Sequence, residues 1–278
     1  MTTTLRPSGP IQQGADGAKS CAYDVCDNGR AIGSVKIGTD AAFGTSAGVL
    51  LSLNIDEPSR RRGRGTIAVL AAEEVLRGWG CGQVRLSVPE GNEGAHRMAA
   101  ALGYAERSRN MIKDLGPTAP ALPDGAVARE MTADEFAAWQ RTSVESYAES
   151  WIGQGVPAEQ AMHKSRADHA RNLPDGLDTA GMHFHVLVVG GTVVGHVWVS
   201  VREDDDGEPT GFVFDVEVDE EYRGRGHGRA LMWQAEHITL AAGVRRLGLH
   251  VFAANTPALR LYESLGFRTT YYNLAKNL

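Results

Sequence analysis

The sequence has no apolar run long enough to cross a bilayer as a helix, which takes about 20 residues. Its amino-terminal stretch, M-T-T-T-L-R-P-S-G-P, also lacks the apolar core of a secretory signal peptide. These two absences predict a cytoplasmic protein without a membrane partner.

Cysteine and basic charge are scarce as well. Cys21, Cys26 and Cys81 are the three cysteines among 278 residues, and their odd number and spacing match neither a metal site nor a redox motif. We therefore expect free thiols and no bound metal. Lys and Arg number 28 against 34 Asp and Glu, a formal net charge of −6 at pH 7. This balance argues against nucleic acid as a partner.

What is present is typical of a soluble globular protein, with 42% hydrophobic and 22% charged residues. The chain is long enough for one large or two medium domains. It therefore has the material for sizeable hydrophobic cores.

Residues 212–229 hold the most informative pattern. Apolar residues alternate over 212–218, which predicts a strand, and an amphipathic helix is predicted beyond residue 228. A helix start offers unpartnered N–H groups and the positive end of its dipole, so it suits a phosphate, and glycines let the backbone approach the ligand. The loop residues expected to bind a phosphate are Arg223, Gly224, Arg225, Gly226, His227, Gly228 and Arg229.

The same pattern occurs 163 residues earlier, so the chain reads as two copies of one unit. The matching pairs are Asp56 and Asp219, Arg60 and Arg223, Gly63 and Gly226, Gly65 and Gly228, Asn92 and Asn255, Ala95 and Ala258, and Gly103 and Gly266.

Boundaries follow from composition. Residues 1–19 read as a flexible tail, 20–116 as a shortened first domain, 117–124 as a Pro- and Gly-rich linker and 125–278 as the second domain. The second copy has two extra predicted helices, the first of which opens with a capping box at Thr132. The expected fold class is α/β (α+β), with two mixed central sheets flanked by helices.

Two motifs of the second copy resemble those of the GCN5-related N-acetyltransferase (GNAT) superfamily. One is the R-x-x-G-x-G loop that starts at Arg223, and the other is the run N-T-P-A-L-R-L-Y from Asn255 to Tyr262, followed by G-F at 266–267. Most of both copies fits this pattern. The chain thus resembles a tandem member of the superfamily, in a layout similar to that of mycothiol synthase.

The resemblance implies an N-acetyltransferase that uses acetyl-CoA and no metal. The loop would hold the pyrophosphate, and the pantetheine arm would lie in a splay between the strand 212–218 and the strand 247–252. The Val218 N–H would polarise the thioester carbonyl. Further residues expected to bind coenzyme are Val216, Val218 and Asn255, with Arg60, Gly63 and Gly65 in the first copy.

Tyr262 stands where the superfamily places a donor to the departing thiolate. An amine attacks a thioester only as the free base, so a proton acceptor is needed as well. Glu217 is the preferred acceptor, whereas Asp215 on the same strand face, His250 on the neighbouring strand and bulk water stay open as alternatives. Ala99 and Asn54 replace Tyr262 and Glu217 in the first copy. We therefore expect the first copy to bind coenzyme or to serve as a scaffold, without catalysis.

The expected acceptor is a primary amine of a small molecule or a short peptide. Tyr147, Glu149 and Trp151 lie where the superfamily meets its acceptor, and Tyr271 and Tyr272 are expected to close the same cleft. Such a lining suits a cationic or amphiphilic amine. The protein is expected to be a monomer or a homodimer.

Two other functions fit parts of the pattern. A non-enzymatic acyl-CoA-binding or sensory module would use Tyr262 and Glu217 only for packing. RNA binding through the arginine-rich loops is disfavoured by the net charge and by the strand–loop–helix setting.

Overall fold

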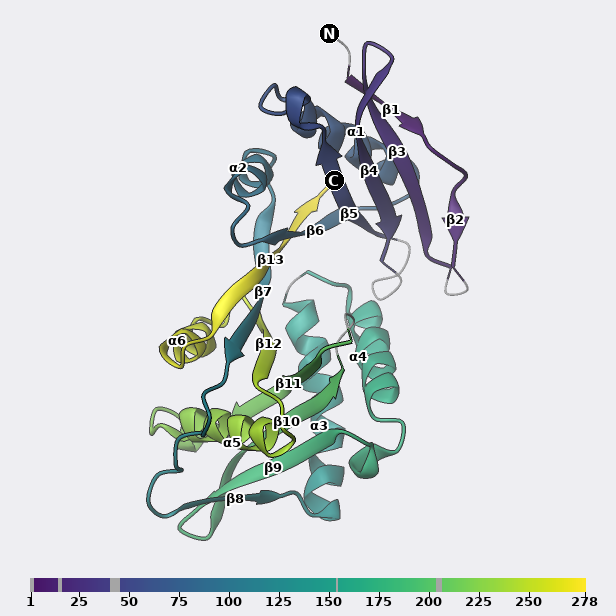
Figure 1. Cartoon of the computed structure of the whole chain (residues 1–278). Coiled ribbons are helices and arrows are strands. Elements are labelled where there is room, and N and C mark those ends of the chain that lie inside the picture. The colour runs from purple at the N-terminus through teal and green to yellow at the C-terminus, as the bar shows by residue number, and fades with distance from the viewer. Residues whose placement is uncertain (1–2, 15–16, 41–45, 154, 204–206) are drawn as a thin grey trace. The chain divides into compact units, whose positions relative to one another are not determined.

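The structure is a computed structural model that describes residues 3–14, 17–40, 46–153, 155–203 and 207–278. The chain forms two compact units (Figure 1). The first unit comprises Met1–Arg107 and Tyr271–Leu278, and the second comprises Ser108–Thr270. These bounds differ from the expected 20–116 and 125–278, because the strand that follows each copy's last helix contributes to the other unit.

The first unit is a mixed sheet in the order β1-β3-β4-β5-β6-β13, with β2 on β3. The strands are β1 (Thr3–Pro7), β2 (Gln12–Gln13), β3 (Lys19–Asp27), β4 (Arg30–Thr39), β5 (Ala47–Ile55), β6 (Gln83–Pro89) and β13 (Arg268–Asn277). The helices are the short η2 (Glu57–Ser59), α1 (Arg64–Gly78) and α2 (Glu93–Ala101). The core of this unit lies between the sheet and its helices and includes Val35, Ile37, Val69 and Leu76.

The tail expected for residues 1–19 is wrong in part. Thr3–Pro7 pairs antiparallel with β3, from Thr3 opposite Asp27 to Pro7 opposite Tyr23. Leu5 packs against the core of the first unit. One partly buried apolar side chain and a row of backbone hydrogen bonds therefore hold a segment whose composition resembles a loop.

The second unit is a mixed sheet in the order β7-β12-β11-β10-β9-β8. Its strands are β7 (Ala105–Asp114), β8 (Ala126–Glu130), β9 (Met182–Val189), β10 (Thr192–Glu203), β11 (Pro209–Val218) and β12 (Arg246–Phe252). Its helices are α3 (Ala133–Ile152), α4 (Ala158–Asn172), η3 (Gly176–Asp178), η4 (Glu220–Tyr222), α5 (His227–Ala241) and α6 (Thr256–Ser264). The capping box expected at Thr132 is confirmed, since the Thr132 and Glu135 side chains each bond the other's backbone N–H.

Helices cover both faces of the second sheet. Leu231 of α5 and Leu259 of α6 belong to one buried cluster, and Trp139 of α3 belongs to another, together with Trp198. Val197 and Val199 lie in the first cluster, so β10 sends successive side chains to opposite faces. In the described part of the first unit, Ser34 and Lys36 of β4 are exposed on the face opposite Val35 and Ile37. The first copy thus lacks the second helical layer, as its shortened sequence predicts.

Two parallel strands in each unit pair only briefly and then diverge. β11 and β12 pair from Gly211 to Val213, although β11 continues to Val218 and β12 to Phe252. β5 and β6 pair from Ala47 to Leu50 and diverge in the same way. A β-bulge marks both places, as a register shift opposite Trp198 in the second unit and opposite Lys36 in the first. The splay expected between these strands is therefore present in both units.

A buried ion pair recurs in each unit. Glu73 of α1 accepts hydrogen bonds from Lys276 Nζ at 2.7 Å and from the Tyr104 hydroxyl at 2.9 Å. Glu236 of α5 pairs with Lys113. Lys276 lies on β13 and Lys113 on β7, so in each unit a charged pair ties one of these strands to the central helix.

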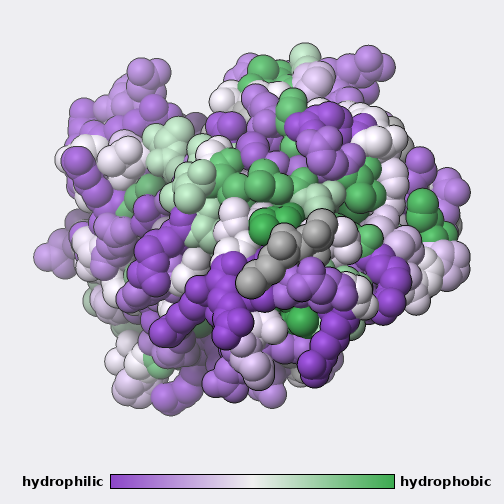
Figure 2. Space-filling view, turned by 90° about the horizontal axis from the view of Figure 1, so that it is seen from above, coloured by the Kyte–Doolittle hydropathy of each residue, from purple (hydrophilic) through white to green (hydrophobic). Residues whose placement is uncertain are grey.

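The surface is mostly polar. Figure 2 shows a face on which hydrophilic residues predominate and smaller groups of hydrophobic residues lie between them. No helix in the described ranges is long and apolar enough to cross a membrane. The three cysteines are buried in the first unit.

The pair at Glu73 gives a stability prediction. Replacing Lys276 by Met leaves a carboxylate that is only 4% exposed without its ammonium partner. We expect a loss of about 2–3 kcal/mol in the free energy of unfolding, less than the roughly 3–5 kcal/mol of a fully buried pair, because the lysine is partly solvated. Urea unfolding measures it, with the exposed Lys36→Met as control. Equal effects of the two variants would contradict a stabilising role.

Candidate active site

The phosphate loops start helices that have no side-chain cap. Gly226 at the start of α5 and Gly63 at the start of α1 adopt left-handed backbone angles, φ +87° and +74°, and neither helix shows a capping side-chain hydrogen bond. By contrast, Asn255 and Asn92 cap α6 and α2 by accepting from backbone N–H groups. The first-turn amides of α5 and α1 therefore remain available to an anion. The residues of both loops fit a coenzyme pyrophosphate.

The last glycine of each loop lies close to the following helix of the motif. A Cβ at Gly228 would lie 3.2 Å from Cδ2 of Leu261, and one at Gly65 would lie 3.5 Å from Sδ of Met98. The missing side chain thus lets α5 start against α6, and α1 against α2. Arg61 takes a left-handed conformation, φ +57°, where the second loop has Gly224 at +76°. The loops therefore share a backbone path despite this substitution.

The loop arginines are held by protein oxygens. Arg223 Nε donates to the Val218 carbonyl at 2.9 Å, and Arg60 Nε donates to the Ile55 carbonyl at 2.6 Å. Arg225 donates to the Glu221 carbonyl at 3.1 Å. Arg223 and Arg60, which begin the two loops, therefore each close the turn between the preceding strand and the loop. The sequence alone did not predict this role.

The neighbouring arginine and histidine positions differ between copies. Arg229 donates to the Ser264 hydroxyl at 2.8 Å. His227, the first residue of α5, is half-buried, whereas its counterpart Arg64 is buried and paired with Asp27. The positive charge near the first helix start is thus partly neutralised by Asp27.

Val216 and Val218 direct their backbone groups into the splay. The Asp219 N–H donates to the Val194 carbonyl. In an antiparallel pair, the backbone N–H and C=O groups of Asp219 and of every second residue before it therefore point toward β10. The N–H and C=O of Val216 and the N–H of Val218 therefore point to the other edge, where β12 has diverged, and the Val218 carbonyl there already accepts from Arg223. An extended amide-bearing arm in the splay would find its backbone partners there.

Tyr262 lies on α6 and is 6% exposed, beside Phe267 at a centroid distance of 5.9 Å. Burial, together with the charge of Asp215, raises the pKa of Tyr262 to about 12. The hydroxyl is therefore protonated at neutral pH and suited to donate a hydrogen bond.

Glu217 is half-exposed and lies 3.5 Å from Arg223, measured from its carboxylate oxygen to the guanidinium nitrogen. Asp215 is more enclosed. Its Oδ2 accepts from Trp139 Nε1 at 3.0 Å and lies 2.9 Å from His196 Nε2. The β-bulge between Val213 and Asp215 sets this second carboxylate beside the aromatic layer under α3.

His196 was not predicted from the sequence as a site residue. Burial lowers the pKa of His196, but the hydrogen bond and charge of Asp215, with the charges of Glu217 and Asp219, outweigh it and raise the pKa overall. Burial likewise opposes ionisation of Asp215, whereas hydrogen bonds from His196 and Trp139 hold its pKa below the usual value. His196 lies opposite Glu217 on the adjacent strand, so a strand register was needed to find it.

An aromatic cluster lies between α3, α4 and β12. The rings of Tyr147 and Trp151 are 6.0 Å apart, and Trp151 stacks against His250 at 6.5 Å. Lys164 Nζ bonds Asp168 at 2.7 Å and also lies 5.2 Å from the Trp151 ring. The charge of Asp168 is therefore neutralised by Lys164 of the same protein.

Three further residues expected around the acceptor are not part of this aromatic cluster. Glu149 is exposed on α3. Tyr271 and Tyr272 belong to the first unit, where they pair with β6 and Tyr272 contacts His96. The described residues contain no group of three or more His, Cys, Asp or Glu side chains arranged to hold a metal ion.

Comparisons with known proteins identify the family. The model of the acetyltransferase (GNAT) family matches residues 5–104 and 137–267, so the chain belongs to this family. The N-acetyltransferase YycN of Bacillus subtilis, itself described as uncharacterized, is 31% identical over 150 residues, which cover 53% of this chain and 96% of the relative. The mycothiol acetyltransferase of Thermobispora bispora is 35% identical over 215 residues, 74% of this chain and 68% of that protein.

A solved tandem GNAT protein from the clavulanic acid biosynthesis pathway shares the fold, with a TM-score of 0.54 and 20% identity over 94% of this chain and 83% of that one. The tandem GNAT fold is therefore confirmed. The protein is an acetyl-CoA-dependent acetyltransferase. This assignment favours an enzyme over a non-enzymatic acyl-CoA-binding module.

Removing the Tyr262 hydroxyl tests its role. Tyr262→Phe keeps the buried ring, so we expect acetyl-CoA binding and thermal stability to stay close to those of the parent. Turnover should fall by about 100- to 10,000-fold, the range typical of a proton-transfer group. Steady-state rates and calorimetric binding check both points. Unchanged turnover, measured where chemistry limits the rate, would leave Tyr262 with a packing role only.

Proposed function

We propose that the second unit transfers an acetyl group to a primary amine of a small molecule or short peptide, by direct attack of the amine on the thioester. The observation that carries the proposal is the uncapped start of α5 after β11, together with the splay of β11 from β12, whose side chains share one buried cluster with Tyr262. The loop binds the pyrophosphate, the N–H groups of Val216 and Val218 bind along the splay, and Asn255 supports the site by capping α6.

Asp215 and His196 take the ammonium proton in this proposal. Their side chains form a hydrogen-bonded pair that joins β10 to β11, the strand that borders the splay. Glu217, the acceptor preferred from sequence, is half-exposed and lies beside Arg223. Glu217 is then better placed to hold the loop than to receive the proton.

The acceptor binds beside the aromatic cluster of Tyr147 and Trp151. Lys164 already covers the Trp151 ring and neutralises Asp168, so this wall favours an amine with apolar or polar groups over a multiply charged cation. The relatives named mycothiol acetyltransferases support a small-molecule acceptor.

The first unit holds a second coenzyme without turning it over. It keeps an uncapped helix start at α1 and a splay between β5 and β6. Ser52 and Ser34 stand where the second unit has Asp215 and His196, and Ala99 stands where it has Tyr262. The first unit therefore offers a binding site without groups to move a proton.

Variants of two carboxylates show which of them accepts the proton. Asp215→Asn removes the carboxylate of the proposed proton-accepting pair, so we expect the rate to fall by about 100-fold or more. Glu217→Gln should change the rate only a few-fold, because its carboxylate is half-exposed and paired with Arg223. Rates over a pH series with saturating acetyl-CoA check this. The reverse ranking would return the role to Glu217.

A negative side chain placed in one loop or the other distinguishes the roles of the two units. Gly228→Asp places a carboxylate at the phosphate position of α5 and should abolish transfer. Gly65→Asp should remove one binding event and leave transfer in the second unit largely intact. Gly228→Ala and Gly65→Ala control for size, because a Cβ at these positions comes within 3.2 and 3.5 Å of a neighbour. Loss of transfer in a folded Gly65→Asp protein would show that catalysis lies in the first unit.

A further inference from the structure

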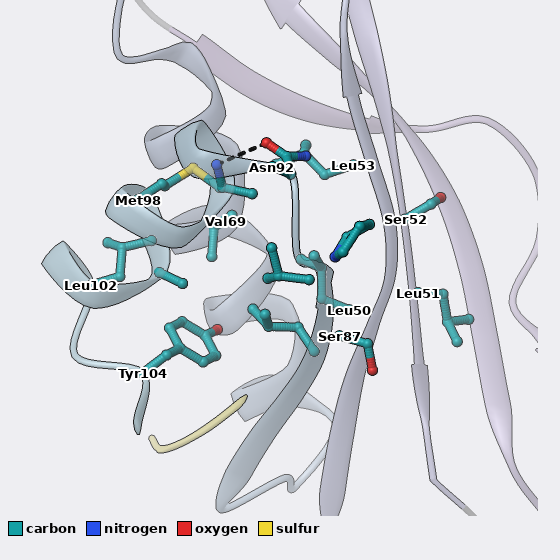
Figure 3. Close-up of a pocket in the computed structure, with 15 residues that line it drawn as sticks. Leu50, Leu51, Ser52, Leu53, Val69, Ser87, Asn92, Met98, Leu102 and Tyr104 are labelled. Carbon is teal, nitrogen blue, oxygen red and sulfur yellow. Dashed lines mark hydrogen bonds between the residues drawn. The ribbon is translucent and has the colours of Figure 1, made fainter. Parts of the chain in front are cut away.

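The splay of the first unit opens into a cavity of about 170 Å³. It lies between β5 and β6 and beside α2 (Figure 3). Met98, Leu102 and Tyr104 flank one side, and Leu50 and Ser87 flank the other. The remaining lining is mostly apolar. The space is therefore suited to a hydrocarbon group.

The cavity exists because small residues replace large ones. Ala99, 3% exposed, occupies the helix position at which the second unit buries the phenol of Tyr262. Val69 likewise replaces the fully buried Met232. A neighbouring position keeps an aromatic ring in both units: Tyr104 stands in place of Phe267, and its hydroxyl donates to Glu73. The space that the phenol fills in one unit is thus open in the other.

The mouth of the cavity is also apolar. Leu51 lines the cavity at the β-bulge of β5 and is 52% exposed. Its counterpart Phe214 stacks on Trp198 at 4.5 Å, beneath the helical layer of the second unit. The first unit lacks that layer in its described part, so the apolar side chain of Leu51 is exposed at this border of the cavity instead of lying beneath a helix.

We propose that the first unit binds an acyl thioester of coenzyme A whose acyl chain is longer than acetyl, with the chain in the cavity beside Ala99. This inference rests on the proposed coenzyme site of the first unit. The α1 loop holds the pyrophosphate, β5 and β6 hold the arm, and the cavity selects the acyl group by apolar contact.

Calorimetric titration of the Gly228→Asp protein isolates the first unit. The probes are CoA, acetyl-CoA, butyryl-CoA, hexanoyl-CoA and octanoyl-CoA. Burying each added methylene should tighten binding about fourfold until the cavity is full. Ala99→Tyr, which restores the residue of the second unit, should flatten this series while CoA itself still binds.

The exposed Ala100→Tyr on the same helix is the matched control and should keep the chain-length dependence. Ala99→Leu, which fills part of the cavity, replaces the tyrosine variant if that variant does not fold. It should weaken the dependence of affinity on acyl-chain length. Equal affinity for CoA and all acyl-CoAs, unchanged by either Ala99 variant, would overturn the acyl proposal and leave the coenzyme site standing. No binding of any probe to a folded Gly228→Asp protein would instead reject the coenzyme site of the first unit.

Discussion

The divergence of two parallel strands is the constraint on which the site depends. Once β12 leaves β11 after Val213, the backbone groups of Val216 and the N–H of Val218 face an edge without a neighbouring strand at pairing distance, whereas the Val218 carbonyl accepts from Arg223. Backbone polar groups need a partner, and an amide-bearing coenzyme arm can supply it. On its other edge β11 packs closely against β10: a Cβ at Gly195 of β10 would lie 2.3 Å from the Glu217 carbonyl oxygen. Tight packing on one edge of β11 thus accompanies an open edge on the other.

The two copies keep this scaffold and differ in what fills it. Each has a bulge, a left-handed glycine before its central helix and a buried Glu–Lys pair. The reactive positions instead changed to small side chains in the first copy, with Ala99 in place of Tyr262. Because a small side chain removes volume as well as chemistry, the first copy has a cavity beside Ala99 where the second copy has the phenol of Tyr262.

Local sequence predicted the motif and missed its surroundings. Glycines at fixed spacing reveal the loops and the duplication, because few residues tolerate those backbone angles. The exchange of β7 and β13 was not predictable, since Lys113 and Lys276 occupy equivalent positions and either strand fits either sheet. Strict alternation put Asp215 and Glu217 on one face, and the strand register agrees, but it could not reveal the hydrogen bond of Asp215 to His196 on the next strand. The register across strands, which no single segment encodes, decided both outcomes.

Fate of label in a single turnover tests the central claim, that one unit reacts and the other only binds. The protein is loaded with radiolabelled acetyl-CoA to two equivalents, mixed with an amine that it acetylates and an excess of unlabelled CoA, and quenched over time. The account predicts that one labelled acetyl group per chain appears on the amine in a fast phase, while the other is recovered as acetyl-CoA. Transfer of both groups at one rate would contradict it.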